Sequence, residues 1–158
     1  KVSRNPIRVD ADEVTYNLHI ILRFELEQSL FSGDLEIKDL PGAWNEKAEK
    51  LLGLQPTCDA EGVLQDVHWS GGAFGYFPSY CLGNLLAAQL WERALEEDIP
   101  DPEDPSKLLS WLELKVHRYG RRMNLLELTK GVTGDSLDPR CLLRYLESRY
   151  VSLYEKAN

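Results

Sequence analysis

Apolar residues recur at helical spacing along most of this chain, and no segment shows the alternation of apolar and polar residues that is typical of a strand. The first helical segment, residues 7–32, contains neither glycine nor proline and has apolar positions on more than one face. This pattern predicts a helix that is buried on several sides. Asp10 is expected to cap its N-terminus, and Gly33 is expected to follow its last turn. The pattern as a whole predicts an all-α fold.

Two more helices are predicted in the middle of the chain. One covers residues 44–52 as an amphipathic surface helix and should end at Gly53. The other covers residues 77–98 and tolerates Pro78 in its first turn, where a missing backbone N–H costs nothing. Its N-terminal half is apolar almost all round, so this half is expected to enter the core.

The C-terminal third begins with a connector, because residues 96–105 contain six acidic residues and three prolines, a composition that disfavours helix. Ser106 is then expected to cap a helix that ends at Gly120. A short helix is predicted over residues 125–130. Asp138, followed by a proline, should cap a terminal helix with a continuous apolar stripe.

Composition narrows the class of protein. The chain is 43% apolar and 28% charged, as expected for a soluble globular protein, and its 158 residues suit one domain or a large piece of a bigger one. The formal net charge of −8 disfavours nonspecific nucleic-acid binding, which depends on cations that neutralise phosphates. No apolar run is long enough for a membrane span, and no leader peptide is visible. Three widely spaced cysteines suggest neither a disulfide framework nor a metal site, so reduced thiols in a cytoplasmic protein are expected.

One local departure from the acidic balance is the basic spot formed by Arg118, Arg121 and Arg122. The ordinary interpretation is a solvated helix end. A nucleic-acid contact is the weaker alternative, and it would show as salt-sensitive binding.

The stretch Glu61–Asn84 is the part of the chain that core packing does not explain. Asp66 and His68 should point to the same side of this glycine-bounded segment, so Asp66 could orient the imidazole. An oriented histidine, with a phenol from Tyr76 or Tyr80, can donate hydrogen bonds to a charge that develops on a substrate oxygen. The alternative is a structural cluster that only fixes the loop.

Arg8 has two interpretations as well. It precedes Asp12 by four residues, so a surface ion pair between neighbouring helical positions is the simpler one. The other is a guanidinium that presents its two-pronged edge to a substrate carboxylate.

Several catalytic patterns are missing from the sequence. It contains no HExxH, no GxSxG, no P-loop and no dinucleotide-binding glycine pattern. No two of its three histidines lie within five residues, so a self-contained zinc site is not expected. Any catalytic metal would have to be supplied by another segment.

Two motifs carry a family resemblance. IRVDAD at residues 7–12 and GVLQDVHW at residues 62–69 match the patterns I-R-x-x-A-D and G-x-x-Q-D-x-H-W in full and in order. The chain therefore resembles the carboxypeptidase Taq family of zinc metallocarboxypeptidases. The residues that continue both motifs, and VHRYGRR at residues 116–122, are also similar to that family, so the resemblance covers essentially the whole chain.

This resemblance implies that residues 1–158 are the C-terminal helical part of a larger, mostly helical metallopeptidase domain. In the family, the HExxH helix and a further zinc-binding glutamate lie upstream of the I-R-x-x-A-D motif, and this chain contains neither. Zinc and the glutamate of HExxH activate water there, and the enzyme releases C-terminal amino acids with broad specificity. The chain alone would then hold no metal and be inactive.

The resemblance also implies residue roles. Arg8 would recognise the free carboxylate of the substrate, and His68, with Tyr76 or Tyr80, would hold that carboxylate or the tetrahedral oxyanion. The expected catalytic residues are His68 and Tyr76, and the expected substrate-binding residues are Arg8, Gln65, Asp66, Tyr80 and Arg118.

The expected partners are the C-termini of peptides and a second copy of the full-length protein in a homodimer. Neither nucleic acid nor membrane is expected as a partner. The alternative function is a non-catalytic helical interaction or dimerisation domain that keeps the motifs for packing.

Overall fold

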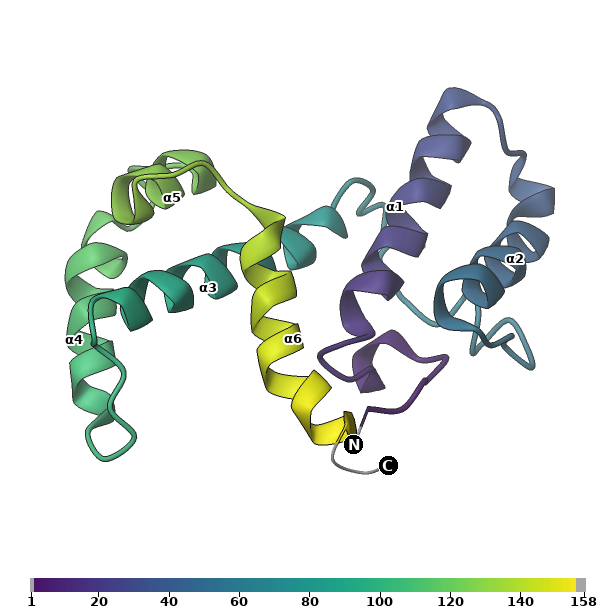
Figure 1. The fold of residues 1–158 in the computed structure, drawn as a ribbon. Helices are drawn as coiled ribbons and strands as arrows, with labels where there is room; N and C mark the ends of the chain where they lie inside the picture. Colours follow the sequence, from purple (N-terminus) through teal and green to yellow (C-terminus); the bar gives the residue numbers. More distant parts are fainter. Residues whose placement is uncertain (1, 156–158) are drawn as a thin grey trace. The chain divides into compact units, whose positions relative to one another are not determined.

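The computed structural model describes residues 2–155, which form helices and loops and contain no strand (Figure 1). The α-helices of this range are α1 (Tyr16–Ser32), α2 (Leu40–Leu52), α3 (Pro78–Glu96), α4 (Pro105–Lys115), α5 (Leu125–Thr133) and α6 (Pro139–Glu155). Three short 3-10 helices are η1 (Arg8–Asp10), η2 (Ile37–Asp39) and η3 (His117–Tyr119). The predicted all-α fold class is confirmed.

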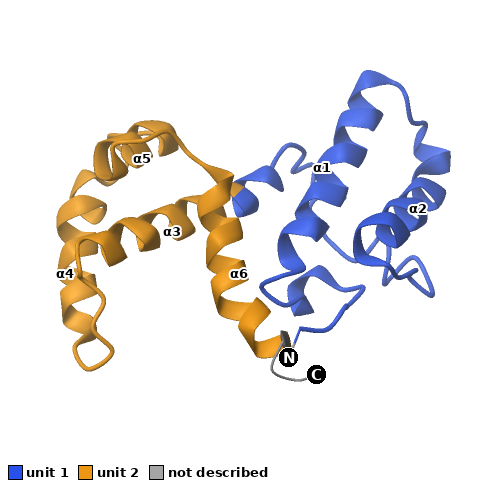
Figure 2. Cartoon of the chain, in the orientation of Figure 1, with its two compact units in different colours: residues 1–81 blue, residues 82–158 orange. Residues whose placement is uncertain are grey.

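The chain divides into two compact units, residues 1–81 and residues 82–158, and each has a hydrophobic core of its own (Figure 2). In the first unit α1 and α2 pack side by side (Figure 1). Leu22 and Leu26 of α1 contact Trp44 and Ala48 of α2, and each of the four is at most 3% exposed. A spacing of four residues on each helix puts both contact residues on one face, which confirms the apolar stripe predicted for α2.

The boundaries of α2 follow local chemistry. Gly53 ends the helix, as predicted, with a φ of 65° and an N–H that donates to the Glu49 carbonyl at 2.9 Å. The helix begins at Leu40, with a proline in its first turn, and therefore earlier than the predicted residue 44. Proline lacks only an N–H that the first turn leaves unbonded in any case.

The predicted start of the first helix was wrong. α1 begins at Tyr16 rather than at residue 7, and Asp10 does not cap it but lies in η1. The reason is Asp12, whose Oδ1 accepts hydrogen bonds from the backbone N–H groups of Val14 at 3.0 Å and Thr15 at 2.9 Å. These bonds satisfy the donors of the turn that leads into α1, and the Tyr16 N–H donates to the Asp12 carbonyl at 2.9 Å, so the chain enters the helix after Asp12.

One buried face of α1 is polar. His19, Arg23 and Glu27 follow one another at four-residue intervals and are 1%, 0% and 4% exposed. Arg23 Nη1 donates to the His19 carbonyl at 2.8 Å. The prediction that α1 is buried on several sides was wrong, because Ile21, Phe24 and Phe31 are 37%, 41% and 71% exposed. The helix buries one broad face, and part of that face carries charge.

The core of the second unit joins three helices. Leu90 and Ala94 of α3 contact Trp111 of α4 and Val132 of α5. The indole Nε1 of Trp111 donates to Glu97 Oε2 at 2.7 Å, which satisfies its only donor.

The core contribution of α3 differs from the prediction. Its buried residues lie between Ala88 and Ala94, in the C-terminal half, whereas Leu82 in the N-terminal half is 39% exposed. Phe77, directly before the helix, is 1% exposed instead. The ring of Phe77 is therefore buried, whereas the first apolar turns of α3, which were predicted to enter the core, are not.

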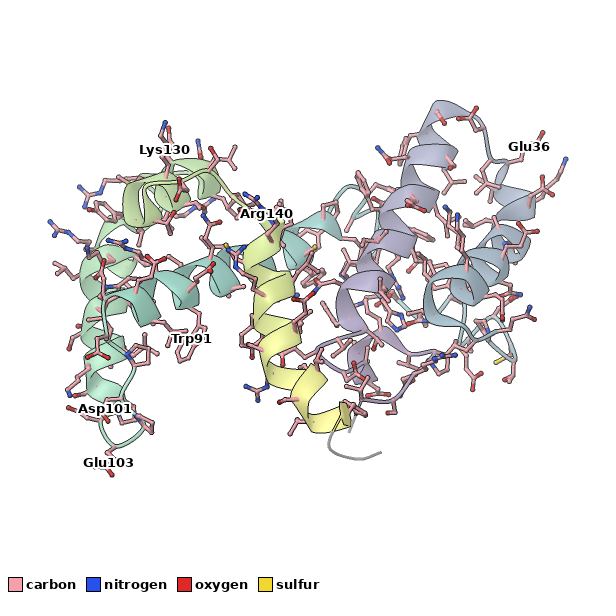
Figure 3. All side chains as sticks on the ribbon, in the orientation of Figure 1. Glu36, Trp91, Asp101, Glu103, Lys130 and Arg140 are labelled. Atoms are coloured by element: carbon pink, nitrogen blue, oxygen red, sulfur yellow. The ribbon has the colours of Figure 1, made fainter. Side chains whose placement is uncertain are left out.

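The connector between α3 and α4 is confirmed as a non-helical, acidic loop. Figure 3 shows Asp101 and Glu103 projecting from it. Asp104, not Ser106, caps α4, because its Oδ1 accepts from the Ser106 N–H at 3.2 Å. Glu103 N–H donates to Asp101 Oδ1 at 2.9 Å, so the loop bonds its own backbone.

The ends of the C-terminal helices also differ from the predicted ones. α4 ends at Lys115, and η3 covers the residues up to Tyr119 before Gly120, whose φ is 54°. α5 extends to Thr133 instead of residue 130. α6 begins at Pro139 as predicted.

Asn124 is expected to stabilise α5. Its Oδ1 accepts from the Glu127 N–H at 3.0 Å, and Glu127 Oε2 accepts from the Asn124 N–H at 2.9 Å, a reciprocal capping box. Asn124→Ala should lower the free energy of unfolding by about 1 kcal/mol, measured by urea titration. Asn124→Asp keeps an acceptor and serves as the control. Equal unfolding midpoints for wild type and Asn124→Ala would contradict this.

His19 should make stability depend on pH. Burial, together with the charge of Arg23, lowers the pKa of His19 from 6.5 to about 4. As the pH falls, the unfolded chain therefore protonates at His19 before the folded chain does. The free energy of unfolding that depends on neutral His19 is fully present above pH 6.5 and is lost as the pH falls towards 4. Urea unfolding of His19→Gln should show a smaller loss of stability across this range than wild type.

The exposed His117 offers a matched control. His117→Gln should keep the pH dependence of the wild-type chain. If His19→Gln keeps it as well, the loss of stability in this range has another origin.

Candidate active site

The loop between α2 and α3 carries most of the candidate residues on a series of turns. Ala73 N–H donates to the His68 carbonyl at 2.8 Å, and Gly72 and Gly75 have φ values of 75° and 71°. Only glycine adopts such angles without strain. The loop folds back so that the rings of His68 and Tyr76 lie 5.7 Å apart between centroids.

Gln65 connects this loop by hydrogen bonds to the segment that contains Arg8. Its Nε2 donates to the carbonyls of Pro6 at 2.9 Å and Glu61 at 2.6 Å. Its Oε1 accepts from the Arg8 N–H at 2.8 Å. The donors and the acceptor of the amide are all engaged within the chain, which explains why an amide, and not a carboxylate, occupies this position.

Asp66 lies between two arginines. Arg8 donates from Nη2 to Oδ1 at 2.7 Å and from Nε to both carboxylate oxygens at 3.1 and 3.2 Å. Arg23 donates from Nε to Oδ2 at 2.7 Å, and its Nη2 lies 2.6 Å from the same oxygen. The side chains of Asp66, Arg8 and Arg23 are 12%, 8% and 0% exposed.

The three groups remain charged. Burial raises the pKa of Asp66, but the hydrogen bonds from Arg8 and the charge of Arg23 outweigh it, so the pKa lies below its ordinary value. Burial lowers the pKa of Arg23 to about 10, which still leaves it a cation at neutral pH. Two cations and one anion give this cluster, Arg8, Arg23 and Asp66, an excess of one positive charge.

His68 borders the cluster. Its Nε2 lies 3.1 Å from the Tyr80 hydroxyl, and its ring packs against Phe77 with centroids 4.4 Å apart. Its Nδ1 is buried 3.8 Å from Asp66 Oδ1, too far for a hydrogen bond, and has no partner among the described residues. Asp66 therefore does not orient the imidazole as predicted, and the Tyr80 hydroxyl is its hydrogen-bonding partner.

The two tyrosines extend the site to the surface. Tyr76 is 52% exposed, and its ring meets that of Tyr80 edge-on with centroids 5.4 Å apart. Burial and the neighbouring Tyr76 raise the pKa of Tyr80, so its hydroxyl stays protonated. The arrangement joins a buried positive charge to a series of hydrogen-bonding groups that reaches solvent.

Arg8 does not form the simpler of its two predicted interactions. Its partners are Asp66 and the Tyr16 hydroxyl, which accepts from Nη1 at 2.9 Å, and not Asp12. Asp12 binds Ser3, Val14 and Thr15 instead. The surface ion pair was thus a wrong interpretation, because Arg8 is only 6% exposed.

Two site residues were missed by the sequence analysis. Arg23 binds Asp66, and Glu27 accepts from Trp69 Nε1 at 2.6 Å and from the Gly75 N–H at 3.1 Å. The available signal was their four-residue spacing beside the apolar positions Leu22 and Leu26, because a charge close to a buried stripe needs a buried partner.

The remaining candidate, Arg118, lies in η3 of the second unit, where its guanidinium is 5.5 Å from the Tyr119 ring centroid. Its place in the site stays a prediction. No three His, Cys, Asp or Glu side chains among residues 2–155 are arranged to bind a metal ion. Over the same range, no helix combines the length and the apolar character that crossing a bilayer requires.

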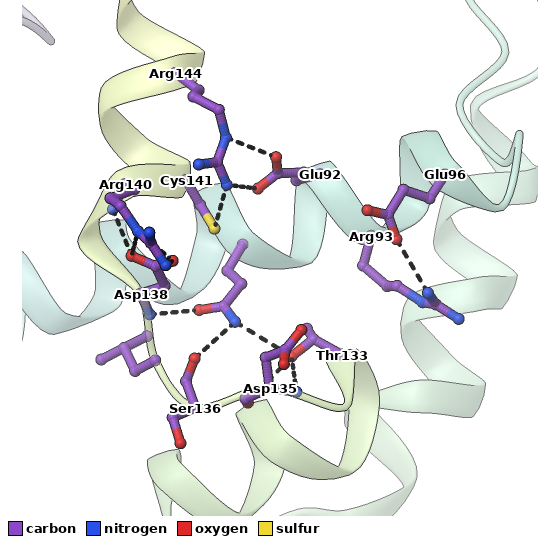
Figure 4. Close-up of a pocket in the computed structure, with 12 residues that line it drawn as sticks. Glu92, Arg93, Glu96, Thr133, Asp135, Ser136, Asp138, Arg140, Cys141 and Arg144 are labelled. Atoms are coloured by element: carbon purple, nitrogen blue, oxygen red, sulfur yellow. Dashed lines mark hydrogen bonds and ion pairs between the residues drawn. The ribbon is translucent and has the colours of Figure 1, made fainter.

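The second unit contains a cleft of about 610 Å³ between α3, α6 and the segment that precedes α6 (Figure 4). Charged groups that line it bind one another. Arg144 donates to Glu92 from Nε at 2.9 Å and from Nη2 at 2.8 Å, and Arg140 lies 2.7 Å from Asp138. Each of these two pairs is neutral, whereas the cluster around Asp66 has an excess positive charge.

Comparison with known proteins identifies a family that matches most of the chain. The family model described as carboxypeptidase Taq (M32) metallopeptidase matches residues 1–150. Carboxypeptidase 1 of Bacillus subtilis (strain 168) is 48% identical over 154 residues, and thermostable carboxypeptidase 1 of Thermus thermophilus is 48% identical over 153 residues. Each match covers 94% of this chain but 30% of the relative, so the chain spans about a third of the length of these curated relatives.

Solved structures of carboxypeptidases are also similar to this chain in fold. The M32 carboxypeptidase of Deinococcus radiodurans R1 is 45% identical, with a TM-score of 0.91 over 98% of this chain and 32% of that one. Metallocarboxypeptidase 1 of Trypanosoma cruzi is 43% identical, with a TM-score of 0.90 over 95% of this chain and 32% of that one. The family match, the sequence identity and the fold agree, and the chain belongs to the carboxypeptidase Taq (M32) metallopeptidase family.

Proposed function

We propose that this chain is the C-terminal part of a metallocarboxypeptidase, called the complete enzyme below, that releases C-terminal amino acids from peptides with broad specificity. The supporting observation is the excess positive charge of Arg8, Arg23 and Asp66 beside the hydrogen-bonding groups of His68 and Tyr80. An exopeptidase has to distinguish a free terminal carboxylate from an internal peptide bond, and a buried cation does so.

Arg8 would bind the substrate carboxylate with the guanidinium N–H groups that its present partners leave free. Its bonds to Asp66 and Tyr16 use one N–H group each of Nε, Nη1 and Nη2, the Nε group being shared by both Asp66 oxygens, and a guanidinium has five N–H groups. The guanidinium carbon lies 5.2 Å from the centroid of Tyr80. Gln65 and Asp66 would then serve substrate binding by holding Arg8.

His68, Tyr76 and Tyr80 would stabilise negative charge on the substrate. In the tautomer that carries its proton on Nε2, His68 donates to the Tyr80 oxygen and leaves the Tyr80 hydroxyl proton for a substrate oxygen. Tyr76, beside Tyr80 and half exposed, can donate from the solvent side. Donors that are fixed before the reaction stabilise a developing oxyanion most strongly.

The described residues do not fit a metal ion, although the family is one of metallopeptidases. We infer that the complete enzyme holds its metal, which we propose to be zinc, in a part outside this chain. Arg118 as a further substrate-binding residue, a homodimer and a cytoplasmic location are part of the same proposal.

A non-catalytic interaction domain is the second candidate. Large apolar side chains are exposed on the first unit, with Ile37 at 82%, Val67 at 79% and Phe31 at 71%. Such residues would suit a surface that packs on another protein. This candidate requires that the complete protein binds no metal and cleaves no peptide.

The complete enzyme should cleave a blocked dipeptide that has a free C-terminal carboxylate, and a chelator should abolish the cleavage. The 158-residue chain alone should be inert in the same assay, because its described residues form no metal site. Product release is followed by chromatography. Cleavage by the complete enzyme that survives the chelator would contradict the proposal.

Arg8→Ala in the complete enzyme should lower kcat/KM by roughly 10- to 100-fold for a substrate with a free carboxylate, because a charge-assisted hydrogen bond contributes about 1.5 to 3 kcal/mol. The amidated form of the same substrate should be cleaved poorly by wild type and variant alike. Steady-state kinetics on both forms measures the preference for the carboxylate.

Arg4→Ala is the matched control for Arg8→Ala. Arg4 belongs to the same segment but is exposed, and it donates to the Gly53 carbonyl at 3.2 Å. The control should keep the preference for the free carboxylate. If Arg8→Ala keeps it too, Arg8 does not recognise that group.

A further inference from the structure

A buried carboxylate on α1 binds the loop that carries the candidate catalytic residues. Glu27 is 4% exposed, and its two oxygens bind different parts of the loop. Oε1 accepts from Trp69 Nε1 at 2.6 Å, and Oε2 accepts from the Gly75 backbone N–H at 3.1 Å. One side chain thus joins two positions that are six residues apart in the sequence.

These two positions lie between the candidate catalytic residues, next to each of them. Trp69 directly follows His68, and Gly75 directly precedes Tyr76. The segment between them reverses direction through Gly72, whose N–H donates to the Trp69 carbonyl at 3.0 Å. The distance between the ends of this turn decides where the imidazole and the phenol lie relative to each other.

The indole that Glu27 binds is fixed in orientation. The Trp69 ring meets the rings of Trp44 and Phe77 edge-on, with centroids 6.0 Å apart in both cases. Trp69 therefore cannot turn away from Glu27 without giving up two aromatic contacts. The hydrogen bond from Nε1 holds the loop, and not merely a mobile side chain, against α1.

The same helix fixes the other side of His68. Arg23 lies one turn before Glu27 on α1 and binds Asp66, two residues before His68. His68 is thus bracketed by Asp66 and Trp69, and both are held by adjacent turns of one rigid element.

We propose that Glu27 is a positioning residue of the active site, which sets the placement of His68 and Tyr76 by binding both ends of the loop between them. This inference rests on the proposed carboxypeptidase function. It assigns Glu27 no contact with substrate.

A carboxylate is required at this position because both of its bonds need an acceptor. Glutamine offers one acceptor oxygen and presents an NH₂ group to the second donor, so Glu27→Gln should release one end of the loop without changing the volume of the side chain. Trp69→Phe removes the indole N–H that donates to Glu27 and keeps an aromatic ring. Each variant therefore removes a hydrogen bond between Glu27 and the loop, one by changing the acceptor and the other by removing a donor.

The test uses the complete enzyme with Glu27→Gln, with Trp69→Phe and with Glu25→Gln as control. Glu25 lies on α1 as well, but its partner is Lys47 at 2.5 Å and its side chain is 45% exposed. Two quantities are measured well below the melting temperature: the ¹⁵N resonances of the His68 imidazole and kcat/KM.

Glu27→Gln and Trp69→Phe should both shift or broaden the His68 resonances and should lower kcat/KM by roughly 10-fold or more. Glu25→Gln should change neither. A lower melting temperature with unchanged His68 resonances, and with kcat/KM within about twofold of wild type, would overturn the proposal, because Glu27 would then only stabilise the fold.

Two outcomes separate this inference from the function on which it rests. If the complete enzyme cleaves no peptide, the proposed function fails, and the His68 resonances alone decide whether Glu27 positions the loop. If Glu27→Gln does not fold, Trp69→Phe decides in its place, and unchanged resonances in that variant overturn the inference.

Discussion

Burial of the Asp66 carboxylate between two arginines is the constraint on which the first unit depends. Removing an ion from water costs several kcal/mol, and an arginine left buried without its partner would destabilise the fold strongly. The segment of Arg8, the middle of α1 and the loop of Asp66 must therefore meet at one point. The surplus positive charge that results gives the candidate site its electrostatic character.

The helices could be predicted from the sequence, whereas the contacts that build the site could not. Leu22 and Leu26 repeat at helical spacing, which predicts that both are core positions without any knowledge of their partner. Arg23 and Glu27 repeat at the same spacing, but their partners lie 43 and 42 residues further along the chain. Helical periodicity shows that a position is buried and not what it binds, so the two residues were missed.

Helix boundaries were mispredicted where a short polar side chain binds nearby backbone donors. Asp12 holds the N–H groups of Val14 and Thr15, and α1 starts later than its apolar pattern suggests. Asp104 replaces Ser106 as the cap of α4 for a similar reason, since both can accept a hydrogen bond and only the geometry decides. The motif residues were identified by resemblance, but the pairing of His68 with Tyr80 is seen only in the folded structure.

The separation along the chain between the partners of Asp66 has a consequence for the order in which the molecule folds. The contact between α1 and α2 joins neighbouring helices and closes a short loop, whereas Arg8 and Asp66 are 58 residues apart. Closing the longer loop loses more chain entropy, so we expect the helix pair to form before the charges meet. In that order the folding chain would assemble its apolar scaffold first and acquire the cationic centre as a late step.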